Sequence, residues 1–269
     1  MWALDQPSPP PRKRLLADTP ARLLAALAAA AAVAVMLARA GLLPPAVLGI
    51  VGVAAGHGAL LATALAWAGC RAQSGLVAVA LLACAATAAA LHPLGALAYV
   101  GVPVWLAWRA RGGRLAALGL GGPVPWPAVG VGALAGLCLG GHLLVSASLT
   151  LGVRLRLDAA GAVLGALAYD LGANVPASEG FFRGALFNRA QRRWSFGAGL
   201  ALSATACVAR YLLDPLLPKS VELLAGAAFY LTLLSAVSCG LFWWSGSLVP
   251  GAAGALLFFA AYRLLGPGA

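Results

Sequence analysis

Charged residues are scarce in this chain of 269 residues. Only 9% are Asp, Glu, Lys or Arg, whereas an ordinary soluble domain has roughly 25%. Hydrophobic residues make up 62%, and the mean hydropathy is +0.92. There is too little polar surface to cover a soluble globule of this size, which argues against a soluble enzyme or binding domain. Because lipid can solvate an apolar exterior, we predict an integral membrane protein.

Long tracts without ionisable residues divide the chain into predicted transmembrane helices, each needing about 20 apolar residues to cross the hydrocarbon core. The predicted segments are 22–43, 46–70, 74–91, 94–109, 127–152, 159–190, 196–213, 219–244 and 247–265. Since two of these segments are short, we expect an all-α polytopic transmembrane bundle of eight or nine spans. We assign 1–21 to a basic tail, 22–112 to N-terminal transmembrane helices and 113–269 to a functional transmembrane core.

Basic residues outnumber acidic ones by 18 to 7, which gives a net charge of +11. On the nine-span scheme most of them fall on one side, so the positive-inside rule places the N-terminus in the cytoplasm. We therefore predict a multi-pass protein of the cell membrane. The charge is explained by topology and by contact with anionic headgroups, so the expected partner is the lipid bilayer and not nucleic acid.

Familiar catalytic and metal-binding motifs are missing. The sequence contains no HExxH, CxxC, GxSxG or phosphate-binding GxxxxGK[ST] pattern. His57, His92 and His142 lie in different predicted spans, so each is expected to be a packed or interfacial histidine. The cysteines occur singly, and we expect all five to be small buried apolar residues: Cys70, Cys84, Cys138, Cys207 and Cys239.

Ionisable residues within a span are costly and are therefore candidates for function. The segment 159–190 holds Asp170, Glu179 and Arg183. Glu179 and Arg183 are four residues apart and share one helix face, where they can form an ion pair. Such pairs have two interpretations, because they either hold a bundle together or belong to a functional site.

A second polar stripe runs along the same segment. Asp170, Asn174 and Ser178 recur every four residues. Pro176 lies between them and has no N–H to donate, so we expect it to loosen the helix locally.

Residues 177–190, ASEGFFRGALFNRA, resemble the first motif of a family of intramembrane metalloproteases. This is the CPBP family (CAAX protease and bacteriocin-processing, also called Abi), whose motif has two adjacent glutamates, three residues and an arginine, usually within aromatic-Arg-Gly. Glu179, Phe182, Arg183 and Gly184 match it. The resemblance covers about residues 115–260, and it implies a membrane-embedded peptidase fold. A Leu-Gly-Leu at 118–120 and a Gly-Ser-Leu at 246–248 fit the family's arrangement.

The chain departs from the family at most catalytic positions. Ser178 stands in place of the first glutamate. The family's Phe-x-x-x-His motif falls on Ala206 and Arg210, and its last histidine motif falls near Ala255 and Phe259. The family's glutamates and histidines are thought to hold zinc or to activate water. One carboxylate without an imidazole is too few for zinc, so we expect no metal and no cofactor.

The resemblance therefore implies a catalytically degenerate family member in which Glu179 and Arg183 are the remnant of the catalytic motif. We hypothesise that Arg183 and Arg210 both face Glu179, so that an ion cluster replaces the metal. The wider candidate polar cluster adds Ser178, Asp170 and His142 as binding residues.

Three functions remain open. The first is a membrane scaffold or regulator that binds a transmembrane or lipidated peptide. The second is an active intramembrane metalloendopeptidase with a rearranged site drawing on His142, Asp170 and Glu179, for which zinc is expected. The third is a small membrane transport subunit, which predicts a continuous polar path through the bundle.

Overall fold

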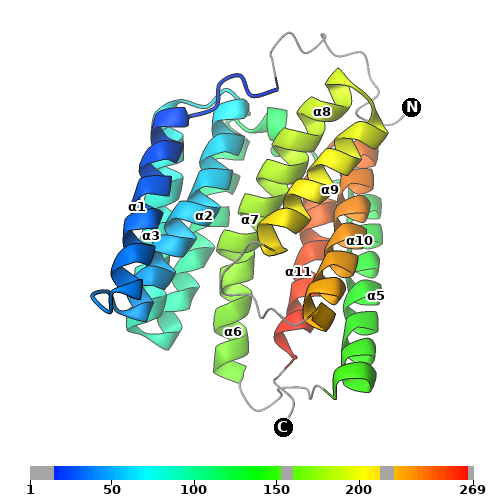
Figure 1. Ribbon diagram of the computed structural model, residues 1–269. Helices are drawn as coiled ribbons and strands as arrows, with labels where there is room; N and C mark the ends of the chain where they lie inside the picture. Colours follow the sequence, from blue (N-terminus) through cyan, green and yellow to red (C-terminus); the bar gives the residue numbers. More distant parts are fainter. Residues whose placement is uncertain (1–14, 153–159, 213–220, 266–269) are drawn as a thin grey trace. The chain divides into compact units, whose positions relative to one another are not determined.

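The computed structural model describes residues 15–152, 160–212 and 221–265. Within these ranges the regular structure is helical and there is no β-strand (Figure 1). The predicted all-α fold class is therefore confirmed for the described part of the chain. The predicted basic tail over 1–21 lies mostly outside it.

The helices follow the predicted segments closely, with ends that differ by a few residues. They are α1 (Ala21–Arg39), α2 (Pro45–Trp67), α3 (Ala72–Leu91), α4 (Gly101–Arg111), α5 (Trp126–Leu151), α6 (Ala160–Tyr169), α9 (Phe196–Leu212), α10 (Val221–Ser245) and α11 (Val249–Arg263). Proline occupies the first or second position of several of them, where its missing N–H costs no helical hydrogen bond.

Two predicted helices are divided in the structure. The segment predicted over 94–109 begins as a 3₁₀ helix, η2 (Pro93–Val100), and continues as α4. His92 starts η2 by accepting a hydrogen bond on Nδ1 from the Leu94 N–H at 3.1 Å. The segment predicted over 159–190 runs through α6, η4 (Asp170–Asn174), α7 (Val175–Ser178), η5 (Glu179–Phe187) and α8 (Asn188–Arg193).

Five helices in the described ranges are long and apolar enough to cross a membrane, namely α1, α2, α3, α5 and α10. The apolar helices α9 and α11 are shorter, with 17 and 15 residues. The structure thus supports several membrane-crossing helices, while the count of eight or nine spans stays a prediction.

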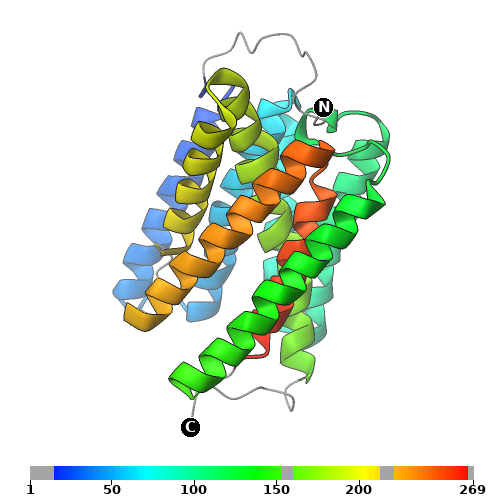
Figure 2. The ribbon, with the colours of Figure 1, turned by 90° about the vertical axis from the view of Figure 1, so that its right-hand side faces the viewer.

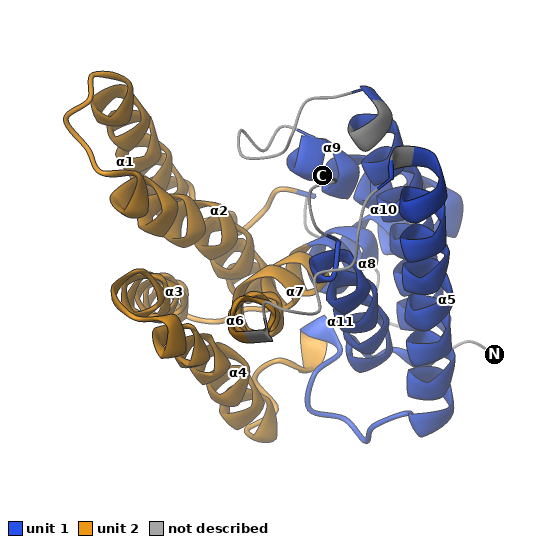
Figure 3. Cartoon of the chain, turned by 90° about the horizontal axis from the view of Figure 1, so that it is seen from below, with its two compact units in different colours: residues 1–15, 118–157, 182–269 blue, residues 16–117, 158–181 orange. Residues whose placement is uncertain are grey.

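The chain forms two compact units (Figure 3). Unit 2 comprises Leu16–Ala117 and Asp158–Phe181. In it α2 packs against α3, with Leu61, Leu65 and Leu82 almost fully buried. Gly172 of η4 lies so close to the Tyr99 backbone that a Cβ at this position would overlap it.

Unit 1 contains Leu118–Leu157 and Phe182–Ala269 among its segments. Its helices α5, α10 and α11 lie side by side (Figure 2). Gly132 and Gly136 of α5 approach the backbone of Pro250 and Gly254 in α11 so closely that no side chain fits between the two helices. Small residues permit this separation, as in many membrane-protein interfaces.

Segment Asp158–Phe181 thus belongs to the same compact unit as the N-terminal helices. The predicted boundary between 22–112 and 113–269 was placed from the sequence and not from packing. The division of the chain into these two functional regions stays a prediction.

Candidate functional site

The polar stripe of the sequence forms a hydrogen-bonded ladder in unit 2. Asn174 donates from Nδ2 to Asp170 Oδ1 at 3.0 Å, and the Ser178 hydroxyl donates to Asn174 Oδ1 at 3.5 Å. The three side chains are only 0%, 3% and 4% exposed, in chain order. Burial of polar groups is costly unless they bond one another, and the ladder meets that requirement within one helical segment.

The backbone around this ladder is irregular. Segments η4 and η5 are π-helical and flank α7, which contains Pro176. The Val175 N–H donates to the Asp170 carbonyl five residues earlier, in place of the usual four. The predicted loosening of the helix around Pro176 is therefore confirmed. Short π-helical turns are rare and often mark functional sites.

A histidine and two tyrosines adjoin the start of the ladder in unit 2. The Tyr169 hydroxyl lies 3.1 Å from His57 Nε2, and the ring of Tyr169 packs edge-on against Tyr99 at 5.5 Å between centroids. The sequence analysis assigned His57 to packing and did not single out Tyr169. Tyr169 directly precedes Asp170 in the sequence, and this neighbour could have marked Tyr169 as a candidate site residue.

Arg183 is a buried cation within unit 1, with only 2% of its side chain exposed. Its Nη2 donates to the Ser235 hydroxyl at 2.8 Å, and its Nη1 lies 3.5 Å from Cys207 Sγ. Arg183 therefore joins η5 to α9 and α10. Hydrogen bonds to a charged group contribute about 1.5–3 kcal/mol each.

Three small polar side chains lie near Arg183 on α9 and α10, and we call them the polar seam: Ser203, Ser238 and Cys239. Ser203 donates to the Phe182 carbonyl at 2.7 Å, and Cys239 Sγ lies 3.7 Å from the Ser203 hydroxyl. Ser238 is also buried, and its hydroxyl has no partner among the described residues. Sequence reasoning missed this seam because serine and cysteine at single positions look like ordinary small helix residues.

Within unit 1, Gly184 of the first family motif meets the other two sequence features used for the family resemblance. Gly184 contacts Leu118 and Leu248, and a Cβ on Gly184 would lie 3.1 Å from each. The Leu248 N–H donates to the Gly119 carbonyl at 3.2 Å. Gly119 has a φ of 74°, in the left-handed region that favours glycine.

The other predicted site residues of unit 1 have partners of their own. Exposed His142 of α5 places Nδ1 2.8 Å from the hydroxyl of buried Tyr230 in α10. Half-buried Arg210 lies over the ring of the neighbouring Tyr211 at 5.0 Å. Glu179 is 4% exposed and belongs to unit 2, so the ion cluster that would join it to Arg210 stays a prediction.

The expectation of five buried cysteines is wrong. Cys207 and Cys239 are buried, but Cys84 and Cys138 are exposed and Cys70 is half-buried. All five are free thiols. An apolar thiol on an exposed helix face costs little where that face contacts lipid, so burial does not follow from the residue type.

The residues at the family's ligand positions do not fit a zinc ion. Buried Ala255 in α11 stands at the family's last histidine position, and buried Phe259 at the Asn four residues later. Ala206, a half-buried alanine in α9, stands at the Phe of the Phe-x-x-x-His motif. In residues 15–152, 160–212 and 221–265 no group of three or more His, Cys, Asp or Glu side chains lies close enough to hold a metal. Arg210, at the second motif, would repel a divalent cation.

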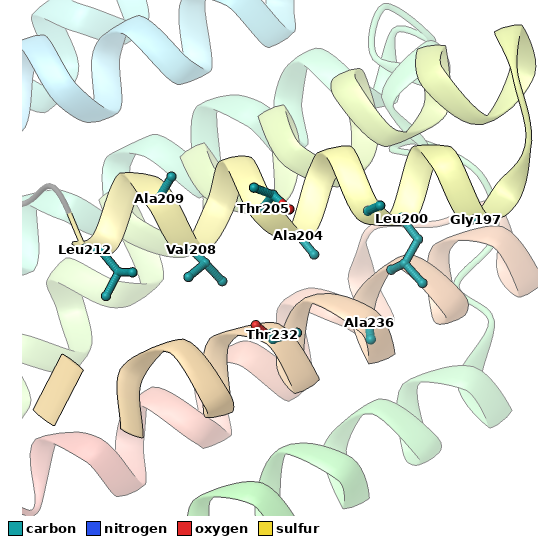
Figure 4. Close-up of a pocket in the computed structure, with 10 residues that line it drawn as sticks. Gly197, Leu200, Ala204, Thr205, Val208, Ala209, Leu212, Thr232 and Ala236 are labelled. Atoms are coloured by element: carbon teal, nitrogen blue, oxygen red, sulfur yellow. The ribbon is translucent and has the colours of Figure 1, made fainter. Parts of the chain in front are cut away.

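An apolar groove of about 460 Å³ runs along α9 beside α10 in unit 1 (Figure 4). Eight residues of α9 and two of α10 line it: Gly197, Leu200, Ala201, Ala204, Thr205, Val208, Ala209, Leu212, Thr232 and Ala236. None of them is charged. The sequence did not reveal the groove because it depends on how two helices pack.

Comparisons of the chain with protein-family models, with curated proteins and with solved structures found no match.

Proposed function

We propose that this chain is a multi-pass membrane protein of the CPBP type that has lost peptidase catalysis. It acts as a membrane scaffold or regulator that binds a transmembrane or lipidated peptide. The five long apolar helices support the membrane location. On the positive-inside rule the N-terminus lies in the cytoplasm.

One observation carries the proposal. The Glu179–Arg183 motif is buried, while the family's two histidine positions hold Arg210 and Ala255. A buried carboxylate and guanidinium in an apolar helix are expensive and are retained only for a structural or functional reason. A single carboxylate cannot serve as both metal ligand and general base.

The contacts of Arg183 support a structural role for this remnant. Its guanidinium binds Ser235 and Cys207, which come from two other helices. Gly184, the next residue, contacts Leu118 and Leu248. The motif thus holds α9, α10 and the 118–120 turn around one segment, which supports a structural role for it.

The test uses the purified full chain in detergent micelles. We expect far less than one zinc per chain by elemental analysis and no cleavage of a fluorogenic prenylated CAAX-type peptide. We also expect that peptide, or a synthetic transmembrane helix, to bind with saturation in fluorescence anisotropy. Stoichiometric zinc, or cleavage that Glu179→Gln abolishes, would restore the active metalloendopeptidase. Absence of binding to both probes would remove the scaffold role.

A further inference from the structure

We infer that the groove along α9 and α10 is a docking site for one transmembrane helix of another protein, with small residues on its contact face and an acidic residue at one end. The inference depends on the membrane location proposed above. It does not depend on the resemblance to a protease family, because the described residues that line the groove belong to α9 and α10 and do not include Arg183, Cys207 or Ser235.

The length of the groove favours a helix over a lipid chain. From Gly197 to Leu212 it follows α9 for about 22 Å, at about 1.5 Å of rise per residue. One leaflet provides only about half of the hydrocarbon core of about 30 Å, or about 15 Å for an acyl chain. The groove extends beyond one leaflet, as the footprint of a crossing helix does.

The residues along the groove favour close helix packing. Gly197, Ala201 and Thr205 are exposed and spaced four residues apart, and half-buried Ala209 continues the row. Small residues at this spacing let two helix backbones approach closely in a membrane.

Charge at one end of the groove determines the kind of partner. Arg192 and Arg193, both exposed, precede Gly197 by five and four residues. Four residues of chain span at most about 14 Å, so a positive charge lies near this end. Exposed Trp194 beside them is typical of a residue at the membrane interface. An Asp or Glu at the matching end of the partner helix would complement these arginines.

The same charge disfavours a second copy of this chain as the occupant. The chain carries a net charge of +11. Two copies with the same membrane orientation are related by a two-fold axis along the membrane normal. A symmetric dimer through α9 would therefore hold Arg193 of both copies at the same membrane surface, where the two charges repel each other. A partner with acidic flanking residues avoids this repulsion.

The experiment measures energy transfer between the labelled full chain and synthetic single-span peptides in neutral phosphatidylcholine vesicles. One peptide has Gly or Ala at every fourth position and Glu at one end; its variants replace the small residues by Leu, or the Glu by Lys. We expect the first peptide to bind and each variant to bind at least tenfold more weakly.

Substitutions on the chain identify the surface. Ala201→Leu fills the groove and should weaken binding at least tenfold. Ala198→Leu is the matched control, since Ala198 is also an exposed alanine of α9 but does not line the groove. Arg193→Glu should reverse the preference, so that the Lys-flanked peptide binds better than the Glu-flanked one.

Three outcomes would overturn the inference. The first is peptide binding that Ala201→Leu leaves unchanged. The second is self-association of the chain that Ala201→Leu abolishes, which would make the groove a dimer interface. The third is retention of phosphatidylglycerol that depends on Ala201 while no peptide binds, which would make it a lipid site. The prenylated CAAX-type peptide separates this inference from the proposed function. If that peptide binds and Ala201→Leu leaves its binding unchanged, while no single-span peptide binds, the inference fails and the proposed function stands.

Discussion

The buried polar residues along the segment 160–193 are held differently in unit 2 and in unit 1. In unit 2 the hydrogen bonds of Asp170, Asn174 and Ser178 run along one helical segment. In unit 1 the buried Arg183 bonds to residues of two other helices. The first arrangement is local in sequence, and the second exists only when η5, α9 and α10 are packed together.

The difference indicates where each unit is sensitive to mutation. A ladder within a helix depends mainly on the four-residue spacing of its members. A cation held across helices also depends on every contact that sets the distances between those helices. We therefore expect unit 1 to respond more strongly than unit 2 to changes of similar chemistry.

The largest effect is expected where helix backbones meet in unit 1. Gly136→Leu would force α5 away from Gly254 of α11 and should destabilise the protein by about 3 kcal/mol or more. Gly141→Leu is the control, because a Cβ on Gly141 of the same helix meets nothing within 4 Å. Thermal unfolding in detergent micelles measures both. A similar loss in the two variants would show that the close approach is unimportant.

A matched pair of serine substitutions compares the two units directly. Ser235→Ala removes a 2.8 Å hydrogen bond from the buried Arg183 and should cost about 2 kcal/mol. Ser178→Ala removes a 3.5 Å bond at the end of the ladder and should cost about 0.5 kcal/mol. Chemical denaturation of both variants gives the two values. If Ser178→Ala is the more damaging change, the comparison between the units is reversed.

The smallest difference between the two units is expected at the two histidine–tyrosine pairs. Tyr169→Phe in unit 2 and Tyr230→Phe in unit 1 each remove one hydrogen bond to a histidine while keeping the ring. We expect a loss of about 1 kcal/mol for each, with no clear difference between units. Melting curves of the two variants in parallel provide the measurement, and a loss confined to one unit would contradict the expectation.

Hydropathy alone located the helices, because the uncharged tracts and the prolines between them determine where apolar helices begin and end. The ladder was also predictable, since Asp170, Asn174 and Ser178 are four residues apart. The division of 94–109 into η2 and α4 was not, because hydropathy does not distinguish a 3₁₀ helix from an α-helix.

The contacts of Arg183 could not be derived from the sequence. Ser235 is 52 residues away, and only the packing of α10 brings it to the guanidinium. The groove on α9 was missed for the same reason, although the spacing of Gly197, Ala201 and Thr205 was visible in the sequence. The absence of the family's histidines was visible in the sequence. The hypothesised ion cluster of Glu179 with Arg210 stays a prediction.

The π-helical turn over Glu179–Phe187 makes the number of residues in this segment as important as their identity. A π-helical turn accommodates one residue more than the α-helical turn it replaces. Deleting one residue here would return the turn to α-helical pitch and leave the residues beyond it close to their present alignment, because the π-helical turn holds one extra residue over the same rotation. Arg183 and Gly184 lie inside the turn, so they would shift relative to α10 and the 118–120 turn without any change of side chain. A single deletion in this stretch is therefore expected to disrupt the contacts of Arg183 and Gly184 while α8, which follows, keeps its alignment.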